Sequence, residues 1–320
     1  MKTAAVLPAL GIGDALLMMI ASHQLLKAGY RVTTYHHALP QLSAWFPGHN
    51  IQSQATPEAL AHCDLILAEN DNSAKIKTLI QEHRSRLAIF YPTYREQKHG
   101  PLSPLDRAFD PTLPMVQNIA LAIQSLLGAA ALSCENGIEP PSHLIRCEDT
   151  TQVLIHPTSR EKMKNWSRRG FIAVAKELKR RGDAPLICVS PQEKEEWKEV
   201  EEEGLALAAP ADLAAFAALV YASKAVIGND SLAGHLASNL GIDAFVIAND
   251  PVRMQLWRPG WHPAHLILPP WQLPNPRWLP LRERHWQRFI SPKKVYGCVC
   301  STVGINAKTQ SRNDAKKSGK

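Results

Sequence analysis

The chain has 320 residues, of which 45% are hydrophobic and 20% are charged. This composition is typical of a globular protein with enough apolar residues for two cores, and it excludes an intrinsically disordered chain. The formal net charge of +7 is concentrated at one end, because residues 271–320 contain 11 of the 36 Lys and Arg residues but 2 of the 29 acids. Residues 1–270 have a small net negative charge, which argues against a nucleic-acid-binding protein.

Nothing in the sequence predicts a membrane span, because no run of about 18 apolar residues is present. The N-terminus resembles a signal peptide, but Asp14 interrupts its apolar run and no small-residue cleavage site follows. We therefore expect a cytoplasmic protein whose basic C-terminal segment makes peripheral contact with the anionic inner membrane face. Six cysteines without a paired framework predict free thiols: Cys63, Cys134, Cys147, Cys188, Cys298 and Cys300.

The first half of the chain alternates short apolar runs with longer helical patterns. Strands are predicted over residues 4–8, 31–36, 63–68 and 86–91. Helices are predicted over about 14–28, 72–84 and 114–128. The proline-rich and charged stretch 92–114 is expected to be a long loop. This alternation predicts βαβ units and a parallel sheet.

The pattern restarts after a turn-rich stretch, residues 129–150, where we place a domain boundary. Strands are predicted over residues 152–157, 185–190, 225–230 and 243–248. Helices are predicted over about 168–181, 192–203, 211–222, from Ser231 onward, and 281–290. The chain is therefore expected to contain two α/β domains in sequence.

A glycine-rich turn follows the first predicted strand. Gly11 and Gly13 permit a tight turn and a close approach of a ligand to the backbone. Asp14 follows at the start of a helix, as a site residue or as a helix cap. The stretch does not match the dinucleotide-binding fingerprint, because Leu16 stands where the third glycine belongs.

Two further polar stretches follow predicted strands of the second half. Thr158, Ser159 and Lys164 bring hydroxyls and a cation to one strand end, as a diphosphate site or as a solvated basic loop. A helix that begins near Ser231 offers free N–H groups to an anion. Asp230 and His235 flank this helix start, as ligand contacts or as a helix cap and a buried histidine.

Three blocks of the sequence together resemble glycosyltransferase family 9, the heptosyltransferases that build the inner core of lipopolysaccharide. The blocks are GIGDALLMMIASHQLLKAGYRVT, IHPTSREKMKNWSRRGFIAVAKEL and VIGNDSLAGHLASNLGIDAFVIANDP. They have the order of the family and span most of residues 1–260. The third block departs from the family pattern, because Leu232 stands where the family usually has glycine.

This resemblance implies an α/β protein of the GT-B fold, with two Rossmann-like domains whose parallel sheets face a central cleft. Residues 1–148 would form the acceptor-side domain and residues 149–280 the nucleotide-sugar-binding domain. A C-terminal helix over residues 281–297 would cross back to the first domain. Residues 298–320 are expected to be a basic, disordered tail, because they contain few apolar residues.

The resemblance also implies a role for each candidate residue. Asp14 would be the general base that accepts the proton of the acceptor hydroxyl. The donor would be bound by six residues: Thr158, Ser159, Lys164, Asp230, Ser231 and His235. Arg95, Lys98 and His99 are candidates for contacts with acceptor phosphates, although their loop can also be read as a mobile charged segment.

The expected reaction is an inverting transfer of a sugar, heptose first among the candidates, from a nucleotide diphosphate to lipopolysaccharide core or a related surface glycan. We expect no metal, because the sequence has no Asp-x-Asp run, and fixed cations would stabilise the leaving group. No cofactor is expected beyond the nucleotide-sugar co-substrate, ADP-heptose above all. Two alternatives stay open: a GT-B-fold sugar-nucleotide epimerase or hydrolase, and a non-catalytic relative that binds nucleotide sugar or glycan.

Overall fold

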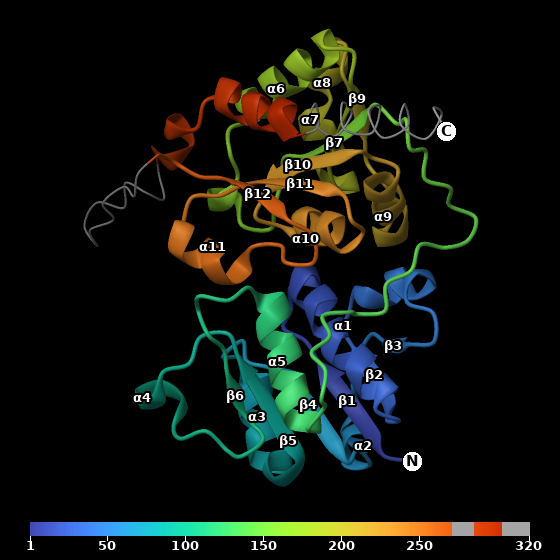
Figure 1. Ribbon diagram of the computed structural model, residues 1–320, viewed down its shortest axis with the longest axis vertical. Helices are drawn as coiled ribbons and strands as arrows, with labels where there is room; N and C mark the ends of the chain where they lie inside the picture. The colour runs from blue at the N-terminus through green and yellow to red at the C-terminus, as the bar shows by residue number, and fades with distance from the viewer. Residues whose placement is uncertain (271–284, 303–320) are drawn as a thin grey trace, which may run out of the picture. The chain divides into compact units, whose positions relative to one another are not determined.

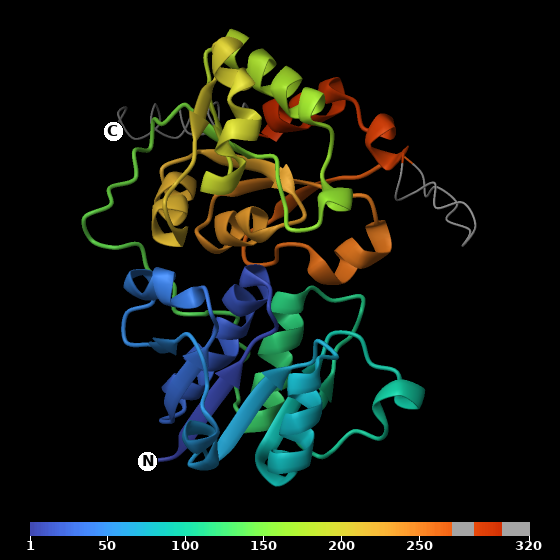
Figure 2. The same ribbon diagram turned by 180° about the vertical axis from the view of Figure 1, so that it is seen from behind.

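The computed structural model describes residues 1–270 and 285–302 of the chain. These residues form two compact units, which Figures 1 and 2 show from opposite sides. Unit 1 comprises Met1–Leu144, Asp212–Ala214 and Val252–Trp261. Unit 2 comprises Ile145–Ala211, Ala215–Pro251 and the described part of His262–Lys320.

Unit 1 contains a six-stranded parallel sheet in the order β3-β2-β1-β4-β5-β6. Its strands are β1 (Thr3–Leu7), β2 (Arg31–Tyr35), β3 (Asn50–Gln52), β4 (Leu65–Glu69), β5 (Leu87–Tyr91) and β6 (Arg107–Ala108). Its helices are α1 (Ile12–Lys27), α2 (Pro57–Ala61), α3 (Ala74–His83), α4 (Glu96–His99) and α5 (Met115–Leu127), with 3-10 turns at η1 (Leu39–Trp45) and η2 (Arg84–Arg86).

Helices cover both faces of this sheet, and the side chains of its central strand alternate between them. Ala4 and Val6 of β1 pack in the same apolar cluster as α1 and α5, which Figure 1 shows in front of the sheet. Ala5 and Leu7 pack on the opposite face with residues of α2 and α3, toward the viewer in Figure 2. Because both faces are buried, the inner strands β1, β4 and β5 consist almost entirely of apolar residues and show no alternation of polar and apolar side chains.

Unit 2 repeats this architecture, with a parallel sheet in the order β12-β11-β10-β7-β8-β9. Its strands are β7 (Gln152–His156), β8 (Ala184–Cys188), β9 (Ala206–Ala208), β10 (Ala225–Asn229), β11 (Asp243–Ile247) and β12 (Ala264–Ile267). Its helices are α6 (Arg168–Arg180), α7 (Lys194–Trp197), α8 (Glu199–Glu202), α9 (Leu213–Tyr221) and α10 (Leu232–Asn239), with 3-10 turns η3 (Lys162–Lys164), η4 (Pro191–Glu193) and η5 (Trp286–Phe289). A further helix, α11 (Pro251–Trp257), follows β11.

The order of strands and helices confirms most of the predicted elements. Every predicted strand is present to within two residues at each end, and the helices predicted over 14–28, 72–84, 114–128, 168–181 and 211–222 are α1, α3, α5, α6 and α9. The predicted acidic helix 192–203 is divided into η4, α7 and α8. The short edge strands β3, β6, β9 and β12 were not predicted, because two to four residues carry too little periodicity.

The C-terminal segment differs from its prediction. The described part of the helix predicted to cross back to the first domain, residues 285–297, packs instead into the core of unit 2, where Trp286, Ile290 and Val295 are buried. Residues 298–302, predicted to be disordered, are helical and bury Val299 in the same core. Apolar residues at a helical spacing explain both differences. Residues 281–284 and 303–320 lie outside the described residues.

The boundary between the units also differs from the predicted one. It lies between Leu144 and Ile145, four residues before the predicted position. The segment Val252–Trp261, predicted as part of the second domain, packs in unit 1, where Leu256, Trp257 and Trp261 join the cluster of α1 and α5. Packing of these tryptophans agrees with their ordinary role as core residues.

Two other expectations concern the chain as a whole. Among the helices of residues 1–270 and 285–302, none combines the length and the apolarity that a bilayer crossing needs. All six cysteines carry free thiols, as predicted. Burial raises the pKa of Cys188 to about 12, so its thiol is inert at neutral pH.

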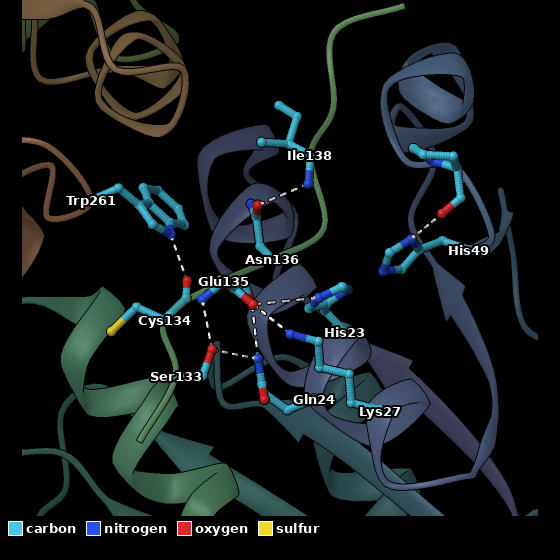
Figure 3. A network of polar contacts seen from close by, with 11 residues as sticks. His23, Gln24, Lys27, His49, Ser133, Cys134, Glu135, Asn136, Ile138 and Trp261 are labelled. Carbon is cyan, nitrogen blue, oxygen red and sulfur yellow. Dashed lines mark hydrogen bonds and ion pairs between the residues drawn. The ribbon is translucent and has the colours of Figure 1, made fainter. Parts of the chain in front are cut away.

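The segment that leads out of unit 1 is fastened to α1 by a set of polar contacts, which Figure 3 shows. Gln24 donates from Nε2 to the Ser133 hydroxyl and to the Glu135 carbonyl, both at 3.1 Å. Lys27 Nζ contacts the Glu135 carboxylate at 2.5 Å. Asn136 donates to the Leu16 carbonyl of α1 at 3.2 Å. These contacts fix the backbone of residues 133–136 along the helix.

Trp261 fastens the same segment from the other side. Its indole Nε1–H donates to the Cys134 carbonyl at 2.8 Å, and Figure 3 shows the two residues facing one another. Cys134 belongs to the stretch that leaves unit 1, and Trp261 ends the stretch that returns to it. A direct hydrogen bond therefore joins two segments of unit 1 that lie 127 positions apart in the chain, each near a point where the chain leaves the unit.

Two stacked histidines lie beneath this segment. The rings of His23 and His49 are 5.4 Å apart at an interplanar angle of 21°. Burial lowers the pKa of both imidazoles below the ordinary value of 6.5, so both are neutral at pH 7. Gly137 lies directly over them: a Cβ on this glycine would meet His49 Cε1 at 2.3 Å and His23 Nδ1 at 2.5 Å. Its φ of +78° also lies in the left-handed region.

We expect Gly137→Ala to lower the free energy of unfolding of unit 1 by about 2–4 kcal/mol, because the new methyl group adds steric overlap to backbone strain. Gly128→Ala is the matched control, since Gly128 has φ +63° but open space around its Cβ position. That variant should cost about 1 kcal/mol, the backbone penalty alone. Chemical denaturation checks both, and equal costs would contradict the packing of Gly137 on the histidines.

Candidate active site

The predicted site residues gather at equivalent places in the two sheets. In each unit the two central strands are neighbours, β1 and β4 in unit 1 and β7 and β10 in unit 2, and the chain continues from them in opposite directions. The loops beyond the carboxyl ends of such strands diverge and leave a crevice, which is where open α/β sheets bind ligands. Asp14 follows β1, Lys164 follows β7 and Ser231 follows β10.

The turn after β1 brings Asp14 back against the backbone. Gly11 is the N-cap residue of α1, and Asp14 is the third residue of that helix. The Asp14 Oδ2 atom lies 2.1 Å from the position that a Cβ on Gly11 would take, so any other residue at position 11 would collide with the carboxylate. Asp14 is half-buried and is not the N-cap residue that the alternative reading proposed. Its place in the first turn favours a negative charge.

A second carboxyl group, from Glu69, lies beside this turn. Glu69 is the last residue of β4 and is 2% exposed. Its Oε2 accepts a hydrogen bond from the Ala9 amide at 3.1 Å. Burial raises the pKa of Glu69 well above its ordinary value of 4.5, and the nearby charge of Asp14 raises it further. Unit 1 therefore holds a pair of interacting carboxyl groups at its switch point.

The same turn borders a pocket of about 510 Å³ at the carboxyl ends of β1 and β2. His36, in its wall, is buried, which lowers its pKa to about 4. The neutral ring accepts the Ala38 amide at Nδ1 at 3.3 Å, so Nε2 carries the proton and donates to the Leu10 carbonyl, also at 3.3 Å. His36 thus fixes the turn that leads to Gly11. Lys75 of α3 also lines this pocket.

The candidate acceptor residues Arg95, Lys98 and His99 lie at α4. Arg95 and Lys98 are exposed. His99 is engaged within the loop, since its Nδ1 accepts the Arg95 amide at 3.0 Å and its Nε2 lies 3.0 Å from Asn72 Oδ1. Its ring also stacks on Tyr94, at 5.8 Å between centroids. His99 therefore shapes this loop, and the two exposed cations are the members of the set that a ligand can reach.

In unit 2, the hydroxyl pair after β7 makes hydrogen bonds within the protein. Thr158 is 7% exposed and its hydroxyl donates to Glu193 Oε2 at 3.0 Å. The Ser159 hydroxyl donates to Asn165 Oδ1 at 2.6 Å. One bond joins the loop after β7 to η4, and the other joins two residues within that loop. Both hydroxyls therefore stabilise the conformation of the loop.

Lys164 ends η3 in the same loop. Its ammonium group contacts Glu161 Oε1 at 2.6 Å, and its side chain is 19% exposed against 64% for that of Glu161. The pair is partly solvated, so an anion with more than one charge can compete with the single carboxylate for the lysine.

Asn229 joins the two loops of the unit 2 site. This residue ends β10 and is fully buried. Its Oδ1 accepts the Trp166 amide at 2.8 Å, and its Nδ2 donates to the Pro157 carbonyl at 2.8 Å. The carboxamide therefore holds both ends of the loop that carries Lys164 against the strand that leads to Ser231.

The C-terminal segment supports the same loop from outside. The Trp166 indole donates to the Ile290 carbonyl at 3.2 Å. The Trp286 indole donates to the Met163 carbonyl at 3.2 Å. Gln287 adds a bond from Nε2 to the Asn165 carbonyl at 3.4 Å. The buried Trp286 thus holds η5 against the loop that contains Lys164, and η5 stabilises that loop.

The third predicted stretch forms the start of α10. Ser231 is the N-cap residue, with extended backbone, so Asp230 precedes the cap and is not the cap itself. The Ser231 hydroxyl is buried and has no hydrogen-bond partner among the described residues. His235 is 5% exposed, one turn further along the helix. A buried hydroxyl beside the free amides of a helix start is suited to an anionic ligand.

Sequence reasoning missed Glu69, His36 and Asn229. Each is the last residue of an apolar strand or the residue after it, so the signal was a polar side chain at the carboxyl end of a predicted strand. The part of the chain that the structure describes brings together no three His, Cys, Asp or Glu side chains that could hold a metal ion. Metal independence therefore stays a prediction.

Comparison with known proteins identifies the family that this chain resembles. The model of glycosyltransferase family 9 (heptosyltransferase) matches residues 105–248, which contain the second block and most of the third. The predicted resemblance is thus confirmed, while Asp14 and Glu69 lie outside the matched range. No curated protein sequence matches the chain.

Solved structures of similar fold agree with this match. A family 9 glycosyltransferase from Veillonella parvula superposes with a TM-score of 0.70 at 16% identity, over 94% of this chain and 96% of that one. The E. coli ADP-heptose lps heptosyltransferase II gives 0.68 at 17% identity, over 94% and 98%. The E. coli heptosyltransferase WaaC with ADP gives 0.68 at 12% identity, over 93% and 99%. The fold is that of the GT-B glycosyltransferases, and the family match supports glycosyltransferase activity.

Because folding raises the pKa of Glu69, the free energy of unfolding should fall as the pH rises. A carboxyl group whose pKa is raised by folding stabilises the protein fully below pH 4.5 and loses this contribution as the pH rises through its folded pKa. The glutamine of the variant Glu69→Gln cannot ionise. The free energy of unfolding of this variant, relative to that of the wild type, should therefore increase above pH 4.5 by up to about 1.4 kcal/mol per pH unit. Chemical denaturation at several pH values checks this, and a constant difference would contradict it.

Proposed function

We propose, from the match to glycosyltransferase family 9 and the geometry of the two units, that the protein transfers a sugar from a nucleotide diphosphate to a glycan acceptor. Heptose is the proposed sugar and ADP-heptose the proposed donor. Lipopolysaccharide core or a related anionic surface glycan is the proposed acceptor. The reaction is proposed to invert the anomeric centre and to need no metal ion.

One observation carries this proposal: in each unit, polar groups suited to one part of the reaction lie beyond the carboxyl ends of the two central strands. Unit 1 has a half-buried carboxylate, Asp14, in the helix that follows the turn Pro8–Leu10, and this turn lines a pocket of about 510 Å³. Unit 2 has a cation, Lys164, and a helix start with an unused hydroxyl, Ser231. The first set suits proton acceptance from an acceptor hydroxyl, and the second suits a diphosphate.

The proposed chemistry follows from these groups. An acceptor hydroxyl becomes a good nucleophile when Asp14 accepts its proton. The departing nucleoside diphosphate gains negative charge as the glycosidic bond breaks. The ammonium group of Lys164 and the amides at the start of α10 would stabilise that charge. A direct displacement of this kind inverts the configuration at the anomeric carbon.

Two other functions make different predictions from the same donor. A sugar-nucleotide hydrolase or epimerase would act on the donor alone, and would release nucleoside diphosphate or an epimer without an acceptor. A non-catalytic relative would bind the donor and leave it intact. Leu232, in the first turn of α10, favours the non-catalytic relative, because it stands where the family usually has glycine.

A donor panel tests the unit 2 site. ADP-heptose, other ADP- and GDP-sugars and UDP-sugars are each mixed with the protein, and the melting temperature is recorded. A ligand at a hundred times its dissociation constant adds about 2.7 kcal/mol to stability. Lys164→Ala should weaken donor binding by about 10–100-fold, the value of a charge-assisted hydrogen bond.

Lys162→Ala is the control for this panel, because Lys162 is an exposed cation in the same loop. Its binding of the donor should stay close to that of the wild type. Absence of a shift with every nucleotide sugar would overturn the proposed function. Equal loss in both lysine variants would mean that the loop acts only through its net charge.

Asp14→Asn tests the base. It keeps the size of the side chain and removes its ability to accept a proton, so kcat should fall by about 100-fold or more. Donor binding should be unchanged, because the donor is assigned to unit 2. Transfer is measured with purified acceptor and free nucleoside diphosphate is followed in parallel. A variant as active as the wild type would exclude Asp14 as the base.

A further inference from the structure

Glu69 is held in a defined place beneath the turn that carries Asp14. Strands β1 and β4 are parallel neighbours in register, with Leu7 beside Ala68, so Glu69 follows directly at the strand end. There its Oε2 accepts the amide hydrogen of Ala9 at 3.1 Å. Because Ala9 precedes Gly11 by two residues, Glu69 fixes one end of the turn.

Asp14 lies against the other end of the same turn. Its carboxylate packs on Gly11, where the missing Cβ leaves room for it. The two carboxyl groups thus contact opposite ends of a three-residue stretch of backbone. They interact strongly enough that the charge of Asp14 disfavours a charge on Glu69. When two carboxyl groups interact in this way, a single proton held by the pair removes the repulsion between them.

Burial decides which member of the pair keeps this proton. Glu69 is 2% exposed, whereas Asp14 is half-buried and lies in the first turn of α1, where the helix dipole favours an anion. Ionising Glu69 would place a second negative charge in a site with little solvent. The amide of Ala9 offsets only part of this cost, since one hydrogen bond is weaker than full hydration of a carboxylate.

We propose that Glu69 is the positioning residue of the base: it carries the proton of the carboxyl pair, holds the turn from Ala9 to Gly11, and so keeps Asp14 ionised and in place. The role in catalysis rests on the proposed function, while the position of the proton does not. During transfer the acceptor proton moves to Asp14, and Glu69 keeps its own proton throughout. A neutral residue that can accept the Ala9 hydrogen bond should therefore replace Glu69.

Infrared spectroscopy of the full chain at neutral pH tests the proton directly. The wild type should show the C=O band of a protonated carboxylic acid, and Glu69→Gln should lack it. Asp106→Asn is the matched control, because Asp106 is equally buried but receives two N–H bonds from Arg84 and is held as an ion pair. The control should keep the band. A band that survives in Glu69→Gln would overturn the proposal.

Kinetics test the positioning role. Glu69→Gln should keep kcat within about threefold of the wild type, whereas Glu69→Leu should lose about tenfold or more, with donor KM unchanged. The wild type should lose kcat on the alkaline side, where Glu69 ionises, and Glu69→Gln should not. Equal kcat and equal pH profiles in both variants would contradict the positioning role.

The two measurements separate this inference from the proposed function. If the wild type transfers no sugar but shows the infrared band of Glu69, the proposed function fails and the assignment of the proton stands. If the enzyme is active and the band is absent, the proposed function stands and the inference fails.

Discussion

Parallel pairing of two central strands is the constraint on which the site of each unit depends. In unit 1 the strands are β1 and β4, and in unit 2 they are β7 and β10. Since the chain leaves each pair in opposite directions, the two following loops diverge beyond the strand ends, where open α/β sheets bind ligands. Asp14 and Glu69 meet at the first position, and the loops of Lys164 and Ser231 meet at the second.

Burial then gives these polar residues different properties. Glu69 and Asp14 have the same functional group, yet Glu69 is buried at the end of a strand whereas Asp14 is half-buried at a helix start, and burial raises the pKa of Glu69. His36 shows the same principle, because burial keeps it neutral and leaves one N–H to fix the Leu10 carbonyl. The chemistry proposed for unit 1 therefore arises from differences in solvation between neighbouring groups.

Unit 2 depends more on buried hydrogen bonds. The carboxamide of Asn229 satisfies a donor and an acceptor of the loop that carries Lys164, and Trp286 supports that loop from the C-terminal segment. A buried amide of this kind costs free energy unless both of its ends are bonded, so the loop can take few other conformations. Rigidity of this sort suits the diphosphate site that we propose for unit 2, because its cation would be held in a fixed position.

The sequence alone determined the alternation of strands and helices, because buried parallel strands are short apolar runs and their helices are amphipathic. It also placed Asp14, Lys164 and Ser231 after strands, since glycine, hydroxyl and charged residues interrupt apolar runs visibly. Glu69 could not be predicted as a site residue, because a single acid at the end of an apolar strand has the same local sequence pattern as an ordinary turn residue. Its meeting with Asp14 was decided by the pairing of β1 with β4, which joins residues about 60 positions apart. The position of residues 285–302 in unit 2 was likewise decided by the tertiary structure, because Trp286 packs in a cluster of residues distant in the sequence and donates a hydrogen bond to Met163, 123 positions earlier.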